Sequence, residues 1–73
     1  MQDSRYNRLK VVLAELDVPN KQLAEMLGKT EITISRWSSN KAQPSVEQLF
    51  AIANTLDVDV RDLLYSNKQS NNQ

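Results

Sequence analysis

The chain contains one glycine, Gly28, which stands between two short segments of helical apolar spacing within residues 20–37. Leu23 and Leu27 lie four residues apart on one helical face, and the small Ala24 lies beside Leu23. Glycine enters the left-handed conformation without strain, so Gly28 is expected to end the first of these helices. The pattern therefore predicts two short helices joined by a tight turn, a helix-turn-helix, which is typical of DNA-binding proteins.

The second helix of this pair is predicted from Glu31 to about Ser38, with the Thr30 hydroxyl as its cap. Ile34 and Trp37 are three residues apart and are expected to turn back onto the preceding helix. Stepping about 100° per residue from that buried direction places other residues on the opposite, outward side. The outward set consists of Glu31 at the flank, Ile32, Ser35, Arg36 and Ser39.

The order of motifs along the chain resembles the phage-repressor helix-turn-helix family, the Xre or Cro/C1 type. The motifs that carry the resemblance are Leu23-Ala24-Glu25-Met26-Leu27-Gly28, Thr30 to Trp37, Asn40-Lys41, Gln43-Pro44-Ser45 and Val58-x-Val60-x-x-Leu63-Leu64, within a span from Leu9 to Leu64. The resemblance implies an all-α, compact, five-helix, lambda-repressor-like DNA-binding domain. Lys29 and Asn20 depart from the family pattern, in which an apolar residue and a glutamine are commoner.

The periodicity predicts a first helix that begins near Asp3 or Ser4 and ends within residues 17–19. Its apolar face comprises Tyr6, Leu9, Val12, Leu13 and Leu16. The second helix is expected from Asn20 to Leu27, with Asn20 as a substitute cap because Pro19 stands where a serine or threonine is commoner.

The fourth helix has a clear start signal, because Ser45 and Gln48 are spaced as a capping box. Its broad apolar face, expected to pack into the core, comprises Val46, Leu49, Phe50, Ile52, Ala53 and Leu56. Asp59 and Asp62 repeat the box spacing for a fifth helix. Residues 1–65 are thus predicted to form one helix-turn-helix DNA-binding domain, followed by a disordered polar tail over residues 66–73.

The composition excludes several classes of function. The 73 residues include no cysteine and no histidine, so the usual thiolate and imidazole metal ligands and the usual general base are missing. Asp57, Asp59 and Asp62 do not suggest a metal site, because two of them are accounted for as caps. Apolar runs such as Val11 to Ala14 are far short of a membrane span. We expect a cytoplasmic protein that is not an enzyme, with no cofactor, metal, membrane partner or small-molecule ligand.

The charge distribution is the main compositional objection to DNA binding, because nine basic and nine acidic residues give a net charge of zero. The charges are nevertheless unevenly placed. Residues 20–43 carry four basic and two acidic groups, whereas residues 44–73 carry two basic and four acidic groups. The positive excess therefore coincides with the predicted binding segment.

The outward residues of the 31–38 helix are the candidate base readers. Arg36 suits bidentate recognition of guanine, Ile32 suits contact with a thymine methyl group, and Glu31 can accept from a cytosine amino group. Each also has a plainer interpretation: a solvated arginine, a scattered surface hydrophobe, and a carboxylate that complements the helix dipole. The resemblance implies base reading at the same three positions. The complete predicted base-reading set is Glu31, Ile32, Thr33, Ser35 and Arg36.

Contacts with the DNA backbone are expected at the start of the 20–27 helix and around the 31–38 helix. The predicted set is Asn20, Lys21, Thr30, Ser39, Asn40, Lys41 and Gln43. The resemblance implies this role for Asn20, Thr30, Asn40 and Lys41, whereas Lys21 is proposed from its charge and location.

The resulting prediction is a sequence-specific transcriptional regulator that binds double-stranded DNA, most simply a repressor acting as a homodimer. Apolar residues near the fifth helix, such as Leu64 and Tyr65, are the candidate dimer surface. Two alternatives remain open: a protein-interaction module that kept the fold without reading DNA, and an antitoxin that combines operator binding with toxin capture.

Overall fold

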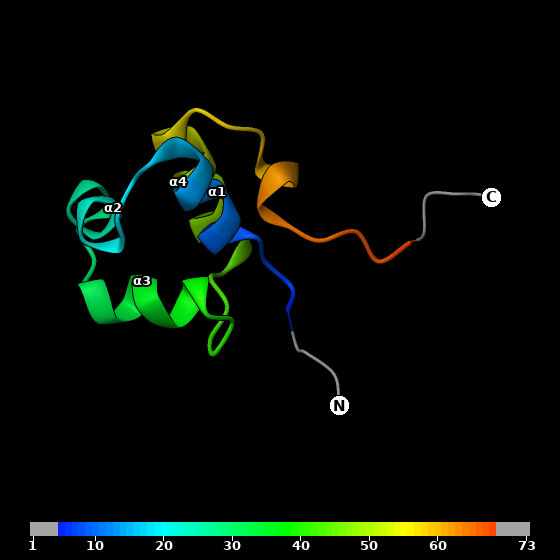
Figure 1. Cartoon of the computed structure of the whole chain (residues 1–73), viewed down its shortest axis with the longest axis horizontal. Helices are drawn as coiled ribbons and strands as arrows, with labels where there is room; N and C mark the ends of the chain where they lie inside the picture. The colour runs from blue at the N-terminus through cyan, green and yellow to red at the C-terminus, as the bar shows by residue number, and fades with distance from the viewer. Residues whose placement is uncertain (1–4, 69–73) are drawn as a thin grey trace.

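A computed structural model describes residues 5–68, and in this part of the chain the backbone forms four α-helices and one short 3-10 helix (Figure 1). In chain order they are α1 (Leu9–Leu16), α2 (Asn20–Leu27), α3 (Glu31–Ser38), α4 (Val46–Leu56) and η1 (Val60–Leu63). The predicted all-helical class and the bounds of the helix-turn-helix pair are confirmed. The expected fifth α-helix is a single 3-10 turn, so the prediction of five α-helices is wrong in that detail.

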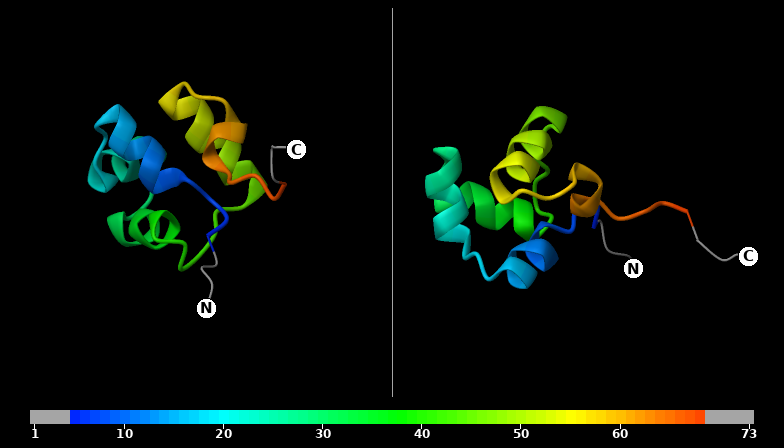
Figure 2. Two further views of the ribbon diagram at one scale, coloured as in Figure 1. Left: turned by 45° about the vertical axis from the view of Figure 1, so that its right-hand side comes forward. Right: turned by 90° about the horizontal axis from the view of Figure 1, so that it is seen from above.

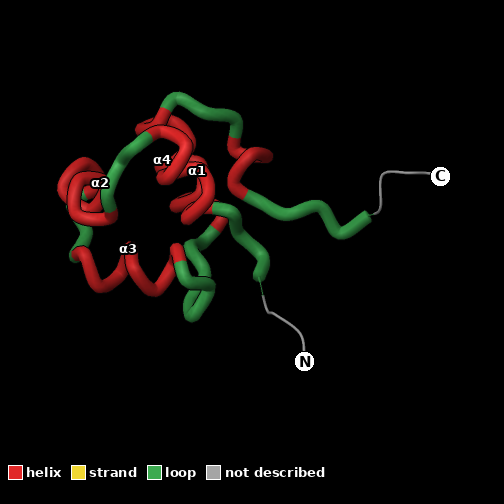
Figure 3. Tube along the Cα trace, in the orientation of Figure 1, coloured by secondary structure: helices red, strands yellow, loops and turns green. Residues whose placement is uncertain are grey.

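The helices enclose one apolar core, to which all four α-helices and η1 contribute. Its buried members are Leu9, Val12, Leu13, Leu23, Ala24, Ile34, Trp37, Ile52, Ala53, Leu56 and Leu63. α2 packs against α3, and α4 packs against both α2 and η1. The tube in Figure 3 shows α3 along one edge of this arrangement, with α1 and α4 on its inner side.

Four residues predicted to face the core are exposed instead. On α4, Val46 is 69% and Phe50 is 51% exposed, because α2 and η1 cover only the side of this helix that carries Ile52. Leu16, at the last turn of α1, is 42% exposed, and Tyr6, before α1, is 63% exposed.

The first helix starts later than predicted. The predicted starting residues Asp3 and Ser4 lie outside the described residues, and α1 begins only at Leu9. The preceding residues pair instead with the end of η1 and the chain after it: the Arg8 N–H donates to the Leu63 carbonyl at 2.7 Å, and the Tyr65 N–H donates to the Tyr6 carbonyl at 3.0 Å. This antiparallel pairing satisfies backbone groups that a longer helix would have used internally.

Of the four predicted caps, those of α3 and α4 are confirmed, that of α2 is wrong, and the box predicted for η1 is wrong. Thr30 accepts a hydrogen bond from the Thr33 N–H, and Ser45 and Gln48 form the full capping box. Asn20 is not a cap, because Pro19 occupies that position and makes no side-chain bond. Asp59 forms no box with Asp62; its carboxylate accepts from the Arg61 N–H, two residues later, because the tighter 3-10 turn brings that group closer.

All four α-helices end in the same way, with one residue in the left-handed conformation: Asp17, Gly28, Asn40 and Asp57. In each case the following residue donates its N–H to the carbonyl five positions back, at 2.9 Å. Gly28 has the role predicted for it, at φ 69°. The other three positions carry Asp or Asn, the residues that tolerate this conformation best after glycine.

The described chain beyond η1 runs outward from the body of the molecule (Figure 2). Of the predicted tail, only residues 66–68 are described, and there the Ser66 hydroxyl accepts from the Lys68 N–H. Residues 69–73 lie outside the described residues. In the described part, every helix is too short or too polar to cross a bilayer.

Candidate nucleic-acid interface

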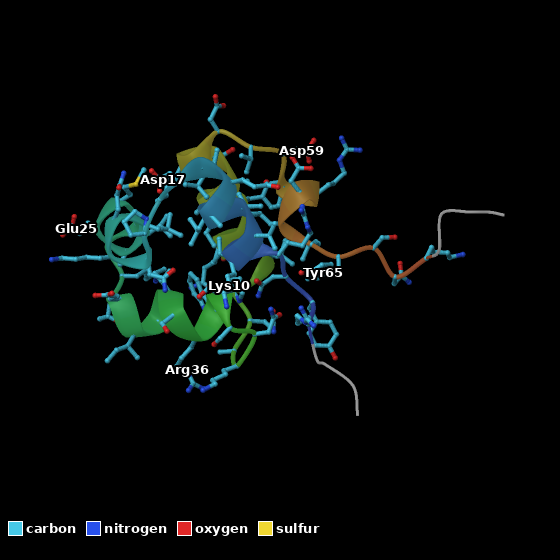
Figure 4. The ribbon with its side chains drawn as sticks, in the orientation of Figure 1. Lys10, Asp17, Glu25, Arg36, Asp59 and Tyr65 are labelled. Atoms are coloured by element: carbon cyan, nitrogen blue, oxygen red, sulfur yellow. The ribbon has the colours of Figure 1, made fainter. Side chains whose placement is uncertain are left out.

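α3 has a buried side and an exposed side, as the spacing of its residues predicts. Ile34 is fully buried and Trp37 is 6% exposed, whereas Ile32 is 73% exposed. Glu31, Ser35 and Arg36 are exposed as well. Figure 4 shows Arg36 on the outer side of α3, directed away from the rest of the molecule. Four of the five predicted base readers thus share one exposed surface.

Thr33, the fifth predicted base reader, is half-buried, and its hydroxyl lies 2.9 Å from the hydroxyl of Thr30. Thr30 also accepts from the Thr33 N–H at 3.2 Å. The two threonines are therefore bonded to each other at the start of α3. This arrangement fixes the first turn and leaves both side chains at the edge of the exposed surface.

α2 supplies the support for α3. Leu23 and Ala24 on α2 are buried against the core, and the left-handed turn at Gly28 brings the two helices into contact. At the start of α2, Asn20 is half-buried and Lys21 is exposed. Both predicted backbone contacts on α2 therefore lie at its first turn, where unbonded N–H groups of a helix are available to anions.

Three side-chain amides, those of Asn7, Asn40 and Gln43, form a bonded group behind the C-terminal end of α3, here called the amide cluster. The Asn7 amide nitrogen donates to the Trp37 carbonyl at 2.9 Å and to the Gln43 side-chain oxygen at 2.8 Å. Gln43 in turn donates to the Asn40 side-chain oxygen at 3.0 Å. The cluster therefore ties the end of α3 to the segment before α1.

Asn40 makes the largest number of these bonds. Its side-chain oxygen accepts from the N–H groups of Tyr6, at 2.9 Å, and Asn7, at 3.0 Å, as well as from Gln43. Its side-chain nitrogen donates to the Asn7 carbonyl at 3.1 Å. Asn40 and Gln43 were predicted to touch the DNA backbone, and their side chains are already engaged within the protein.

The remaining predicted backbone contacts lie on either side of the cluster. The Ser39 hydroxyl donates to the Ser35 carbonyl at 2.9 Å, inside its own helix end. Lys41 is exposed, and within residues 5–68 neither Lys41 nor Arg36 forms a salt bridge or a side-chain hydrogen bond. These two cations are the ones at the end of α3 that remain available to an external anion.

Asn7 is the structurally important residue that the sequence reasoning missed. It is 2% exposed, and its side-chain oxygen accepts from the Leu9 N–H at 3.0 Å, at the start of α1. Asparagine is a preferred residue at helix starts, so this start signal was present in the sequence. The apolar spacing of α1 continues back to Tyr6 and predicts an earlier start, which conceals the signal at Asn7.

Asp59, in the segment after α4, lies away from this surface, as the labels of Asp59 and Arg36 in Figure 4 show. Asp59 pairs with Arg61 at 2.8 Å. Hydrogen bonds from the Arg61 side chain and from its N–H lower the pKa of Asp59 from 3.8 to about 2. The same pairing raises the pKa of Arg61. Asp59 is therefore a fixed negative charge on the side of the molecule opposite α3.

Comparison with known proteins agrees with this architecture. The family model described as helix-turn-helix matches residues 9–63. The crystal structure of a candidate DNA-binding protein from Bacteroides fragilis is similar at a TM-score of 0.79, with 56% sequence identity over 81% of this chain and 95% of that one. No curated protein matches. The match from the start of α1 to the end of η1 shows that the chain belongs to the helix-turn-helix family, in agreement with its resemblance to the Xre or Cro/C1 type.

Proposed function

We propose that this protein is a sequence-specific transcriptional regulator that binds double-stranded DNA by inserting α3 into the major groove. The observation that carries the proposal is the two-sided character of α3: Ile34 and Trp37 hold one side in the core, and the other side presents Ile32 and Arg36. The family match and the likeness to the Bacteroides fragilis protein support it.

The exposed side of α3 offers three kinds of base contact. Arg36, with no partner among the described residues, suits bidentate donation to guanine. Ile32, whose side chain is 73% exposed, suits apolar contact with a thymine methyl group. Glu31 and Ser35 can accept from or donate to base edges, and Thr33 can do so at the margin of the surface.

Contacts with phosphates would hold α3 in register. Lys41 lies in the turn after α3, Lys21 stands at the start of α2, and Thr30 and Ser39 border the two ends of α3. Four basic against two acidic groups in residues 20–43 give this region the sign of charge that DNA attracts. The proposed set of backbone contacts also includes Asn20, Asn40 and Gln43. Asn40 and Gln43 would contribute through the turn after α3, which their side chains stabilise.

We further propose that the protein acts as a homodimer and a repressor in the cytoplasm, without a cofactor and without catalysing a reaction. Two copies would place their α3 helices in successive major grooves, about 34 Å apart on a pseudo-palindrome. Leu64 and Tyr65, each 41% exposed, are the proposed dimer surface. Sedimentation with and without operator tests this point, and a monomeric mass in both conditions contradicts it.

The decisive experiment is selection of bound duplexes from a random pool, followed by titration of the recovered site over a range of salt concentrations. A recurring motif and an affinity that falls steeply with salt are expected. The zero net charge favours one alternative, a protein-interaction module with the same fold. Recovery of no motif, together with no salt-dependent binding to any duplex, would contradict DNA recognition, and salt-insensitive binding to a protein would then favour that alternative.

Lys41 provides a sharper version of the salt test. Lys41→Ala should weaken binding to all duplexes alike and flatten the slope of log affinity against log salt by about one unit, because one phosphate contact is lost. Lys68→Ala removes an equally exposed lysine that lies beyond η1, and it serves as the control. Equal slopes for Lys41→Ala and the control would contradict the phosphate contact.

A further inference from the structure

Tyr6 has an exposed side chain, and both the N–H and the carbonyl of its main chain are hydrogen-bonded within the protein. Its N–H donates to the Asn40 side-chain oxygen at 2.9 Å, and its carbonyl accepts from the Tyr65 N–H at 3.0 Å. The side chain itself is 63% exposed. An aromatic residue on a fixed backbone loses little conformational freedom when it binds a partner, so its exposure suits a contact.

The position of Tyr6 is set by the turn that follows α3. Asn40, which bonds to Tyr6, is the left-handed residue at the end of α3, and Lys41 is next to it. Figures 1 and 2 show the first described residues running beside the loop after α3, toward the side of the molecule on which α3 lies. The backbone of Tyr6 is therefore coupled to the end of the proposed recognition helix.

We infer that Tyr6 is a further DNA-contacting residue, whose phenolic hydroxyl donates a hydrogen bond to a phosphate oxygen that flanks the base pairs read by α3. Asn40 is then a positioning residue, which holds Tyr6 and the Lys41 turn together. This inference rests on the proposed function, because it extends the same interface from α3 to the segment before α1.

Phosphate is the group on DNA that fits this side chain. Tyrosine is among the residues that contact phosphates, and a hydroxyl donated to an anionic oxygen forms one of the stronger hydrogen bonds. Tyr6 lies beside the turn after α3 and not on the exposed face of α3. We therefore expect it to contact the DNA backbone at the edge of the major groove. A contact of this kind adds affinity for every sequence and leaves the choice of sequence to α3.

The test compares Tyr6→Phe with Ser66→Ala on the duplex recovered by selection. Loss of one hydrogen bond to a charged group predicts about a tenfold weaker affinity for Tyr6→Phe, by the same factor on operator and random duplex. The salt slope should not change, because no protein charge is removed. Ser66→Ala removes an exposed hydroxyl beyond η1, whose hydrogen bonds are both to the main chain of Lys68, and should bind like the wild type.

A scan with methylphosphonate, which neutralises one phosphate at a time, locates the contact. Wild-type protein should lose affinity at one flanking phosphate at which Tyr6→Phe shows no further loss. Asn40→Gly keeps the left-handed turn but removes the bonds to Tyr6. In that background, with folding verified by circular dichroism, Tyr6→Phe should cost less than threefold, because Tyr6 is no longer positioned.

The outcomes separate the two proposals. If the wild-type protein binds no duplex, the proposed function fails and takes this inference with it. If the wild type binds and Tyr6→Phe binds equally well, only the inference fails. A Tyr6→Ala variant that changes the oligomeric mass while Tyr6→Phe retains full DNA affinity would overturn the inference in favour of a protein contact.

Discussion

The outward face of α3 and the amide cluster at its C-terminal end lie side by side, and residues in both were predicted to touch DNA. They are built in opposite ways. On the outward face, Arg36 has no partner among residues 5–68. In the amide cluster, Asn40 engages both ends of its amide, and Asn7 is 2% exposed. The type of a polar residue therefore does not show whether its side chain is available to a ligand or is bonded within the protein and stabilises the fold.

The difference has an energetic meaning. A buried amide that loses a partner leaves a donor or acceptor without water, which costs folding free energy. An exposed guanidinium gives up its hydration only when a ligand binds, so its contribution is to affinity. Substitutions in the two regions should therefore separate stability from binding.

The largest effect is expected on the buried side of α3. Trp37→Ala should lower the free energy of unfolding by about 3–5 kcal/mol, because it leaves a cavity where a large buried ring was. Phe50→Ala, at an aromatic residue that is 51% exposed, should cost about 1 kcal/mol. Urea unfolding measures both. Equal losses would mean that the two aromatic rings are not divided into buried and exposed as described.

The next effect concerns the amide cluster. Asn7→Ala should cost roughly 2 kcal/mol of unfolding free energy, because the buried Leu9 N–H loses its acceptor and the Trp37 carbonyl loses one of its donors. Asn54→Ala, at an exposed asparagine on α4, should stay within about 0.5 kcal/mol of the wild type. If both variants unfold at the same urea concentration, the cluster contributes nothing to stability.

On the outward face of α3, a substitution should lower the affinity for DNA and leave the free energy of unfolding unchanged. Arg36→Ala should cost about 1–3 kcal/mol of binding free energy on the selected site and little on random duplex, with unfolding unchanged within about 0.5 kcal/mol. Arg36→Lys keeps the charge but not the bidentate geometry, so it should lose discrimination and retain the salt slope. An equal loss on both duplexes would identify Arg36 as a phosphate contact.

The smallest effect is expected on the side opposite α3. The pKa of Asp59 is lowered by Arg61 from 3.8 to about 2, so the stabilisation from this pair is complete above pH 4 and is lost as the pH falls through 2. The melting temperature of Asp59→Asn should be slightly lower than that of the wild type at pH 6, and this difference should vanish near pH 2. A difference that grows with acidity would have the wrong sign for this pairing.

Local sequence signals located most of the fold. The bounds of α2 and α3, the turn at Gly28 and the caps at Thr30 and Ser45 were all predicted, because each depends on residues within one or two turns. The exposed face of α3 followed from the direction of Ile34 and Trp37. For the candidate site, this local reasoning was enough to place Ile32 and Arg36 at the surface, although their role in binding stays a prediction.

The errors fell where distant segments meet. Tyr6 continues the apolar spacing of α1, yet pairing with Tyr65 keeps it extended and exposed. Val46 and Phe50 continue the apolar face of α4, yet no described segment covers them. Periodicity reports which residues could share a face, but it carries no information about which neighbour covers that face.

What the sequence determined by itself is the set of helices, the sharp turn between α2 and α3, and the side of α3 that faces outward. What only the tertiary structure decided is how the segment before α1 is joined to the end of α3, through bonds that span 33 residues between Asn7 and Asn40. The physical reason is how far apart along the chain the bonded residues lie. Helices and caps are closed by bonds between near neighbours, whereas an asparagine amide suits a cap, a phosphate or a buried cluster equally well until folding brings its partners to it.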